Sequence, residues 1–467
     1  MKVVQHWEIP NNGIPVFYQP DQTSHTVSAF VKVGGMSDPP GILEGQAHIF
    51  EHVGANRALN YSSEEVQMIL RTYSAHHWRE AGIWTSYMNT SFGCGLLRRR
   101  DYILDLFPIF AQMVTHPIVT EEILQTERGA ILNEWALWGE DDIQDRARRR
   151  LLALIYKTNP VLMRMDCNPD QMMAPGTLAQ LKRFCREQYV ASNMGAIILG
   201  PDRNTTKRMA RKAFGDIPSK EARPVPYDTS NAHPVLAETK RDEFDYGDDE
   251  HKGFHLLVGF PIAPWGNPLD EATDVLAETL EFHLEDEIRD RNTDPRLGTY
   301  HPSVWTERTK FHGVFYVWIP AISLDGARRA EEIVGRKIQE IREGRLLDFV
   351  LDRAKTEVPK TKERAAALKI LKRIVGRGVT VMKRPIIDTR IDAYVTQPQV
   401  LAELITDYYC NGGVSAVEKL NAFKKTFRGV TKSSIVKAAN EFLDPNRYAC
   451  VLAKPRNPLD FGRFKRA

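Results

Sequence analysis

Cysteine is scarce in this chain of 467 residues: there are five, and no two of them form a C-x-x-C pair. They are scattered along the sequence, at Cys94, Cys167, Cys185, Cys410 and Cys450. An odd and scattered set argues against a disulfide-stapled scaffold and against a cysteine-rich zinc module. We therefore expect reduced thiols that serve mainly in packing, as in a cytoplasmic protein.

Long apolar runs are missing as well. No stretch approaches the roughly 18 consecutive apolar residues that a membrane span requires, and residues 1–8 lack the apolar core of a secretory signal. The net charge of +3 is too small to indicate a nucleic-acid partner. These absences predict a protein that binds neither membranes nor nucleic acid.

The rest of the composition is typical of a globular protein, with 42% apolar and 26% charged residues. A chain of this length predicts more than one domain. A polar stretch with four prolines separates two halves, so we predict domains at 1–216 and 244–467, joined by a linker at 217–243. Each half contains strands and long helices, and a strand, turn and helix follow in the same order in both. This pattern predicts the α+β class, with two related α+β lobes.

One pentapeptide carries most of the chemical information: His48, Ile49, Phe50, Glu51 and His52 form the pattern H-x-x-E-H. In a helix, His48 and His52 lie one turn apart on the same face, and Glu51 can reach the same patch. Two imidazoles and a carboxylate supply two ligands and a base for a catalytic zinc site. The order is the reverse of H-E-x-x-H, and this composition gives roughly 0.05 such matches by chance. The alternative is a helix whose histidines never meet a metal.

A third ligand is expected on the segment that begins at Thr120, which can cap a helix. Glu127 and Glu134 lie seven residues apart, almost two helical turns, and so share one face. Apolar neighbours predict that this helix is partly buried, and buried carboxylates need a cation or hydrogen-bond donors. The alternative is an ordinary solvated acidic face. Helical character continues to about residue 156, with a break near Gly139.

Several segments, taken in order, resemble the pitrilysin and mitochondrial-processing-peptidase family of inverted-zincin metallopeptidases. They are residues 12–18, 31–39, 45–52, 127–134, 184–194 and 288–300. The resemblance implies one zinc ion per chain, bound by His48, His52 and Glu134. It also implies that Glu51 is the catalytic base and that Glu127 supports the site. Residues 53–58, which follow the pentapeptide, depart from the apolar continuation usual in the family.

The resemblance further implies a substrate-gripping arginine and tyrosine from the second half. Arg289 and Tyr300 are the expected pair, but their separation of 11 residues is wider than usual, and Arg296 is an alternative. An edge strand containing Ala75 and His76 is also expected, and the resemblance implies that it pairs with the substrate backbone; the alternative is an ordinary strand without this role. The family fold implies two α+β lobes that face each other across a cavity. Such lobes come from one chain or from paired chains, so we expect a homodimer or a heterodimer with a related subunit.

We therefore predict a zinc metalloendopeptidase that hydrolyses peptides or small unfolded segments. One alternative is a non-catalytic or peptide-binding subunit of a heterodimeric processing peptidase, although such subunits usually lose metal ligands. Another is a protein with a purely structural metal, although structural sites usually fill all four ligand positions. The basic segment 352–384, with 11 lysines and arginines against three acidic residues, is either a surface that attracts acidic peptides or a solvated helix.

Overall fold

The computed structural model describes most of the chain. The described residues are 4–20, 25–35, 45–73, 82–97, 100–134, 142–156, 172, 174–224, 233–247, 253–288, 301–345 and 398–456. By its internal contacts the chain divides into two units. Unit 1 consists of Met1–Gly139, Asn159–Asp228 and Thr389–Ala422, and unit 2 of Glu140–Thr158, Thr229–Asp388 and Phe423–Ala467.

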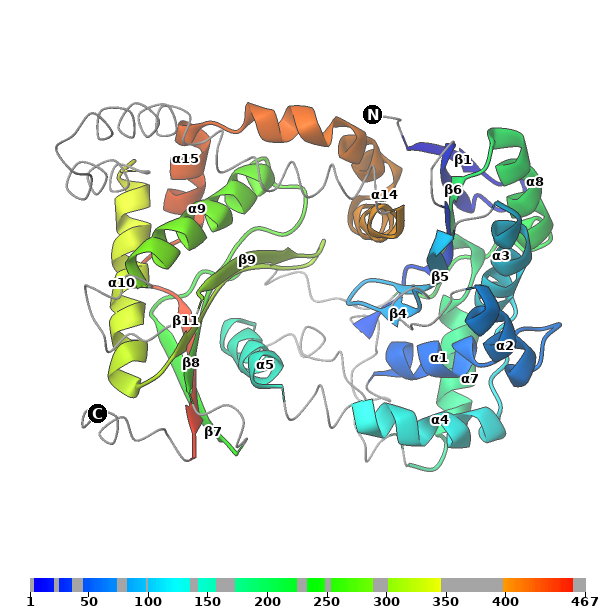
Figure 1. Ribbon diagram of the computed structural model, residues 1–467, viewed down its shortest axis with the longest axis horizontal. Coiled ribbons are helices and arrows are strands. Elements are labelled where there is room, and N and C mark those ends of the chain that lie inside the picture. The colour runs from blue at the N-terminus through cyan, green and yellow to red at the C-terminus, as the bar shows by residue number, and fades with distance from the viewer. Residues whose placement is uncertain are drawn as a thin grey trace. The chain divides into compact units, whose positions relative to one another are not determined.

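Unit 1 contains a mixed six-stranded sheet in the order β1-β2-β6-β3-β5-β4 (Figure 1). Its strands are β1 (Gln5–Glu8), β2 (Pro15–Pro20), β3 (His25–Val31), β4 (Trp84–Thr85), β5 (Thr90–Leu97) and β6 (Met194–Gly200). Its described helices include α1 (Gln46–Ala55), α2 (Ser63–Tyr73), α3 (Arg100–Thr115), α4 (Glu121–Glu134), α7 (Thr177–Gln188) and α8 (Arg203–Phe214). A short 3₁₀ helix at Ala191–Asn193 leads into β6.

Successive side chains of strand β3 point to opposite faces of the sheet, and both faces are covered. Val27 and Ala29 belong to the main apolar core, and helix α3 packs on β3. On the other face, Phe17 of β2 and Phe30 of β3 meet the ring of Tyr409, with centroids 5.1 and 5.8 Å apart. Tyr409 lies in α14 (Pro398–Gly429), whose helical path is broken at Gly413. The first part of this late helix therefore belongs to unit 1.

Unit 2 contains a five-stranded sheet in the order β7-β11-β8-β10-β9. Its strands are β7 (Lys240–Tyr246), β8 (Phe254–Pro261), β9 (Ser303–Arg308), β10 (Gly313–Ala321) and β11 (Ala449–Pro455). Its described helices include α5 (Ile143–Ile155), α9 (Asp270–Ile288), α10 (Leu324–Arg342) and α15 (Lys432–Phe442). Helices α9, α10 and α15 pack against one another and contribute to one apolar core with strands β8 and β10.

The two sheets repeat one topology. In unit 1, β2 runs parallel to β6, and β6, β3, β5 and β4 follow in antiparallel pairs. In unit 2, β7 runs parallel to β11, and β11, β8, β10 and β9 follow in the same way. In each unit, the strand that comes last in the sequence thus lies between two earlier strands, parallel to one and antiparallel to the other. This confirms the predicted α+β class and explains the repeated strand and helix order in the sequence.

The boundaries of the units differ from the contiguous domains predicted at 1–216 and 244–467. Strand β7 begins at Lys240, so the linker predicted at 217–243 extends too far. The reason is that β7 carries charged side chains on its exposed face and buries only Phe244 and Tyr246, a composition that resembles a linker. In addition, α5 belongs to unit 2 and the first part of α14 to unit 1.

Helix α5 joins unit 2 because its apolar face fits that sheet. It packs against β7, β8 and β11, and its buried side chains are Ile143, Ala147, Leu151, Leu152 and Ile155. The approach to β8 is close at Gly259, where an added Cβ would lie 2.5 Å from Leu151 Cδ2. Only glycine therefore permits this contact without a shift of the Leu151 side chain or of the helix.

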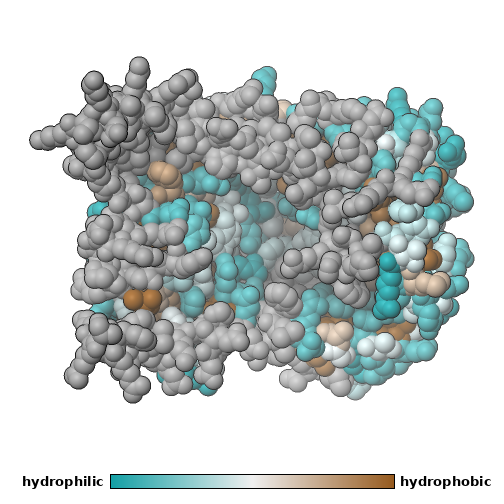
Figure 2. All heavy atoms as spheres, in the orientation of Figure 1, coloured by the Kyte–Doolittle hydropathy of each residue, from teal (hydrophilic) through white to brown (hydrophobic). Residues whose placement is uncertain are grey.

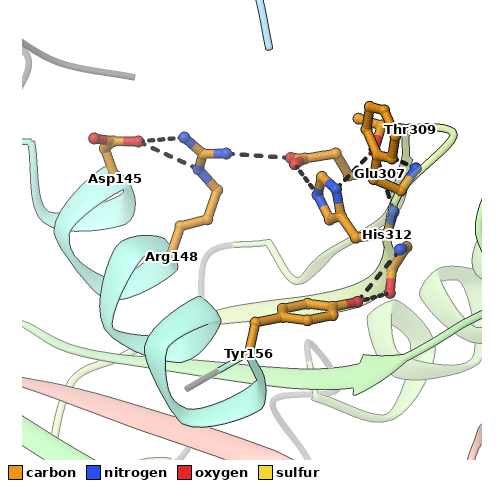
Figure 3. A network of polar contacts seen from close by, with 8 residues as sticks. Asp145, Arg148, Tyr156, Glu307, Thr309 and His312 are labelled. Carbon is orange, nitrogen blue, oxygen red and sulfur yellow. Dashed lines mark hydrogen bonds and ion pairs between the residues drawn. The ribbon is translucent and has the colours of Figure 1, made fainter. Parts of the chain in front are cut away.

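Polar contacts reinforce the position of α5 (Figure 3). Arg148 Nη1 lies 3.3 Å from Glu307 Oε2 on β9, and Glu307 Oε1 lies 3.5 Å from Nε2 of the fully buried His312. At Tyr156, the C-cap residue just after α5, the hydroxyl donates to Gly313 O at 2.9 Å. The helix is thus tied to the β9–β10 hairpin by a largely buried network of charged and polar groups.

The exposed surface agrees with a fold whose apolar residues are mostly internal. On the face in Figure 2, hydrophobic residues with described positions form small patches among hydrophilic ones. The most exposed large apolar side chains, Val235 at 80% and Met68 at 62%, lie in different units. Among the helices that the structure describes, none has both the length and the apolar character needed to cross a membrane.

Candidate metal centre

Helix α1 presents the two histidines of the pentapeptide on one face. It begins after Gly45, whose φ of 72° lies in the left-handed region that favours glycine. Ile49 and Phe50 are fully buried in the core of unit 1, which fixes the helix by its apolar face. His48 and His52 remain partly accessible, with side chains 19% and 18% exposed.

Helix α4 lies beside α1 (Figure 1) and brings the two glutamates. Thr120 caps it as predicted, because its hydroxyl accepts a hydrogen bond of 3.2 Å from Ile123 N. Ile123 and Ile131 are buried on the core side of the helix. The face that carries Glu127 and Glu134 is turned toward the histidines of α1.

Three side chains converge at this place: His48, His52 and Glu134, whose candidate ligand atoms all lie within 4.8 Å of one another. The two Nε2 atoms are 3.2 Å apart. Glu134 Oε2 lies 3.2 Å from His52 Nε2, and Glu134 Oε1 lies 3.7 Å from His48 Nε2. In tetrahedral zinc sites with bonds of 2.0–2.2 Å, neighbouring donors are about 3.3–3.6 Å apart. The donor set and its spacing therefore fit a zinc ion.

The electrostatics of the cluster favour a cation. Burial lowers the pKa of His52, but its hydrogen bonds to Glu127 and Glu134 outweigh burial and raise that pKa to about 10. Hydrogen bonds from His48 and His52 hold the pKa of Glu134 far below its usual range. The site thus binds a proton tightly, and a divalent cation would take the place of that proton.

Glu127 contacts the outer nitrogen of His52 rather than the converging atoms. Its Oε2 lies 3.5 Å from His52 Nδ1, and its Oε1 accepts a hydrogen bond of 2.5 Å from Asn56 Nδ2. A carboxylate at Nδ1 favours the tautomer in which Nδ1 carries the proton and Nε2 has a free lone pair. Carboxylates commonly support metal-binding histidines in this way.

Glu51 lies on the same helix, close enough to both histidines for their charges to affect it. Burial raises the pKa of its carboxyl group above the usual range, while His48, His52 and a hydrogen bond from Thr85 act in the opposite direction. Thr85 is in β4, one of the two edge strands of the sheet. A buried carboxylate with a raised pKa next to a metal cluster is suited to accept and return a proton.

The remaining predicted site residues lie outside the described residues: Arg289, Tyr300, the alternative Arg296, Ala75 and His76. The basic segment 352–384 lies outside them as well. Sequence reasoning missed Asn56 and Thr85. A signal for Asn56 was present, because this polar residue stands one helical turn after His52, where the family pattern is apolar.

Unit 2 holds an arginine in the topologically equivalent region. Its helix α9 follows β8 and packs on edge strand β9, as α1 follows β3 and packs on β4. Arg308 of β9 lies 3.4 Å from Asp270 and 2.6 Å from Asp274 of α9. A guanidinium there supplies the positive charge that carboxylates require. Within the described residues, the cluster of His48, His52 and Glu134 is the one group with metal-ligand spacing.

Two family models match the chain in succession. Residues 16–167 match "Insulinase (Peptidase family M16)", and residues 176–358 match "Peptidase M16 inactive domain". Together they span well over half of the sequence, and the three converging side chains all fall in the first match. The chain belongs to peptidase family M16, which confirms the resemblance inferred from its motifs.

Individual relatives are distant in sequence but similar in fold. An "Uncharacterized zinc protease" of Streptomyces coelicolor is 25% identical over 201 residues, which cover 42% of this chain and 41% of that protein. The chain therefore matches less than half of that relative's length.

Two crystal structures show the likeness in fold. That of a protease from Helicobacter pylori has a TM-score of 0.78 and 16% identity, covering 97% of this chain and 100% of that one. That of a peptidase M16 inactive domain from Pseudomonas fluorescens has a TM-score of 0.72 and 15% identity, covering 97% and 98%. At this level of identity the likeness concerns the fold alone.

Proposed function

We propose that the protein is a zinc metalloendopeptidase that hydrolyses peptides or small unfolded segments. The observation that carries this proposal is the convergence of His48, His52 and Glu134 at zinc-ligand spacing, with Glu51 beside them. Three protein ligands are typical of catalytic zinc sites, whereas structural sites usually have four. Membership of a peptidase family and the name of the Streptomyces relative support the same reading.

In the proposed mechanism, each residue has a defined task. His48, His52 and Glu134 would hold the zinc ion, which when bound would act as a Lewis acid and make a water molecule reactive near neutral pH. Glu127 keeps His52 in the required tautomer. Glu51 accepts the proton of the attacking water and delivers it to the nitrogen of the broken peptide bond. Its raised pKa suits this exchange.

The substrate contacts remain proposals from the family resemblance. Arg289 and Tyr300 would grip the substrate, with Tyr300 also stabilising the developing oxyanion. The segment with Ala75 and His76 would hold the peptide in an extended form. We also propose a homodimer or a heterodimer with a related subunit. We further propose a cytoplasmic location, because five scattered cysteines argue against a disulfide-bonded scaffold.

The test combines zinc content with peptide cleavage. Wild-type protein is expected to bind one zinc ion per chain and to cleave members of a mixed peptide library. Glu51→Gln should retain zinc but lose about 10²–10⁴-fold in turnover, the usual contribution of a general base. Glu64→Gln, which changes an exposed glutamate of α2, is the matched control and should behave as wild type. Full turnover of Glu51→Gln would refute its role as the base.

A second function is favoured by one observation. The C-terminal match and one similar solved structure both carry the description "inactive domain", which fits a non-catalytic or peptide-binding subunit of a heterodimeric peptidase. Under this alternative, zinc-loaded wild-type protein would cleave no peptide alone but would bind peptides or gain activity with a related partner chain. Cleavage by the isolated, zinc-loaded chain would exclude it.

A further inference from the structure

Asn56 links helix α1 to two other helices at the edge of the metal centre. It is the C-cap residue of α1, one turn beyond His52. Its Nδ2 donates to Glu127 Oε1 of α4 at 2.5 Å, and its Oδ1 accepts from Ser63 Oγ of α2 at 2.6 Å. The ionised carboxylate of Glu127 can only accept, so the amide nitrogen of Asn56 faces it, and the hydroxyl of Ser63 holds the amide oxygen on the other side.

The second oxygen of Glu127 continues this chain of contacts to His52. With Oε1 held by Asn56, Oε2 is directed at His52 Nδ1, 3.5 Å away. The other ring nitrogen, Nε2, is the atom that faces Glu134 and the second histidine. The contacts Ser63–Asn56–Glu127–His52 thus place a carboxylate at Nδ1, which favours a proton on that nitrogen and leaves Nε2 toward the other donors.

We propose that Asn56 is a positioning residue of the metal centre and strengthens metal binding through Glu127 and His52. The inference rests on the proposed function, since it takes the bound ion to be zinc. An apolar side chain at this position would fill a similar volume but could not donate to Glu127. Because the Glu127 side chain is only 18% exposed, water would replace the lost donor poorly, and the carboxylate would be free to turn away from His52.

The principal measurement is the zinc dissociation constant, obtained by competition with a chromophoric chelator at fixed pH. Asn56→Leu is expected to bind zinc about 10–100-fold more weakly than wild type, as for other residues that support a metal ligand. Ser63→Ala, which removes the hydroxyl that holds the amide oxygen of Asn56, should weaken binding by a smaller factor. Asn60→Ala is the matched control, because Asn60 is exposed and its described hydrogen bond uses the backbone N–H.

A double-mutant comparison separates positioning from a general structural role. If Asn56 acts through Glu127, the double variant Asn56→Leu/Glu127→Gln should bind zinc no more weakly than Glu127→Gln alone. If Asn56 only held the helices together, the losses of zinc affinity from the two substitutions would instead be additive. It would also lower the thermal midpoint of the metal-free protein, which positioning leaves nearly unchanged.

The outcomes keep this inference apart from the proposed function. Failure of wild-type protein to bind zinc would overturn the proposed function. Wild-type binding together with equally tight binding by Asn56→Leu, or additive losses in the double variant, would overturn the inference alone. If Asn56→Leu does not fold, Ser63→Ala with and without Glu127→Gln gives the same comparison, and additivity there refutes the positioning role.

Discussion

Glu134 Oε2 lies 3.2 Å from His52 Nε2, although 82 residues separate the two in the sequence. The contact joins the C-terminal end of α4 to the last turn of α1. It completes a set of three donors whose spacing fits a tetrahedral zinc ion. The first prediction follows from this pair.

Replacing Glu134 by glutamine should weaken zinc binding more than any change in the supporting residues. The substitution keeps the size of the side chain but removes the negative charge and the anionic donor. We expect the zinc dissociation constant to rise by more than about 100-fold, the upper end for supporting residues. Chelator competition measures it. Glu122→Gln, on an exposed position of the same helix, should bind as wild type; equal affinity of both variants would remove Glu134 from the ligand set.

Removal of the metal should lower the stability of the wild-type protein. An ion that binds only the folded state stabilises it by about 2.7 kcal/mol when its free concentration is 100 times the dissociation constant. Thermal unfolding followed with added zinc and with excess chelator should therefore give a higher midpoint in zinc. In Glu134→Gln at the same zinc concentration the difference should shrink or vanish. An equal shift in both proteins would indicate that zinc binds elsewhere.

The close approach of α5 to strand β8 predicts a coupled pair of mutations. Gly259→Ala would place a methyl group 2.5 Å from Leu151 Cδ2, and overpacking of this kind costs about 1–3 kcal/mol. Leu151→Ala alone should also destabilise, by about 2–5 kcal/mol, because Leu151 is fully buried. The double variant should be more stable than the sum of the single losses predicts. Denaturant unfolding measures the stability of all three variants. Strictly additive losses of stability would contradict a direct contact between the two residues.

The network around Glu307 predicts a dependence of stability on pH. Burial raises the pKa of Glu307, but His312 and Arg148 outweigh it, so the folded-state pKa lies below the unfolded value of 4.5. The group therefore stabilises the fold above about pH 4.5 and loses this contribution as the pH falls through its folded pKa. Glu307→Gln should lower the free energy of unfolding by about 1.5–3 kcal/mol at pH 7. The difference in unfolding free energy between this variant and wild type should become smaller below pH 4.5.

A surface glutamate in the same unit provides the control for this measurement. Glu243 pairs with Lys454 at 2.7 Å, but its side chain is 63% exposed. Exposed pairs contribute little, so Glu243→Gln should leave the denaturant midpoint almost unchanged across the same pH range. A difference between wild type and Glu307→Gln that stays constant from pH 7 to pH 3 would show that charge is not the cause.

Much of the fold could be predicted because the signals are local. The capping pair of Ser62 and Glu65 forms reciprocal hydrogen bonds at the start of α2, and Thr120 begins α4, both as the residue types indicate. The apolar run at Phe254–Pro261 likewise indicates the strand that forms there. The end of the linker was not, because the charged exposed face of β7 hides a strand whose partner, β11, lies some 200 residues later.

The sequence by itself determined the candidate ligand pair of α1, since His48 and His52 meet through the period of a single helix. Only the tertiary structure decided that Glu134 joins them, that Asn56 supports Glu127, and that α5 packs in unit 2. These contacts connect segments far apart in the chain. A helix encodes which of its faces is apolar, but not which sheet will cover that face. That choice depends on shape, as at Gly259, and on buried charges that only the folded chain brings together.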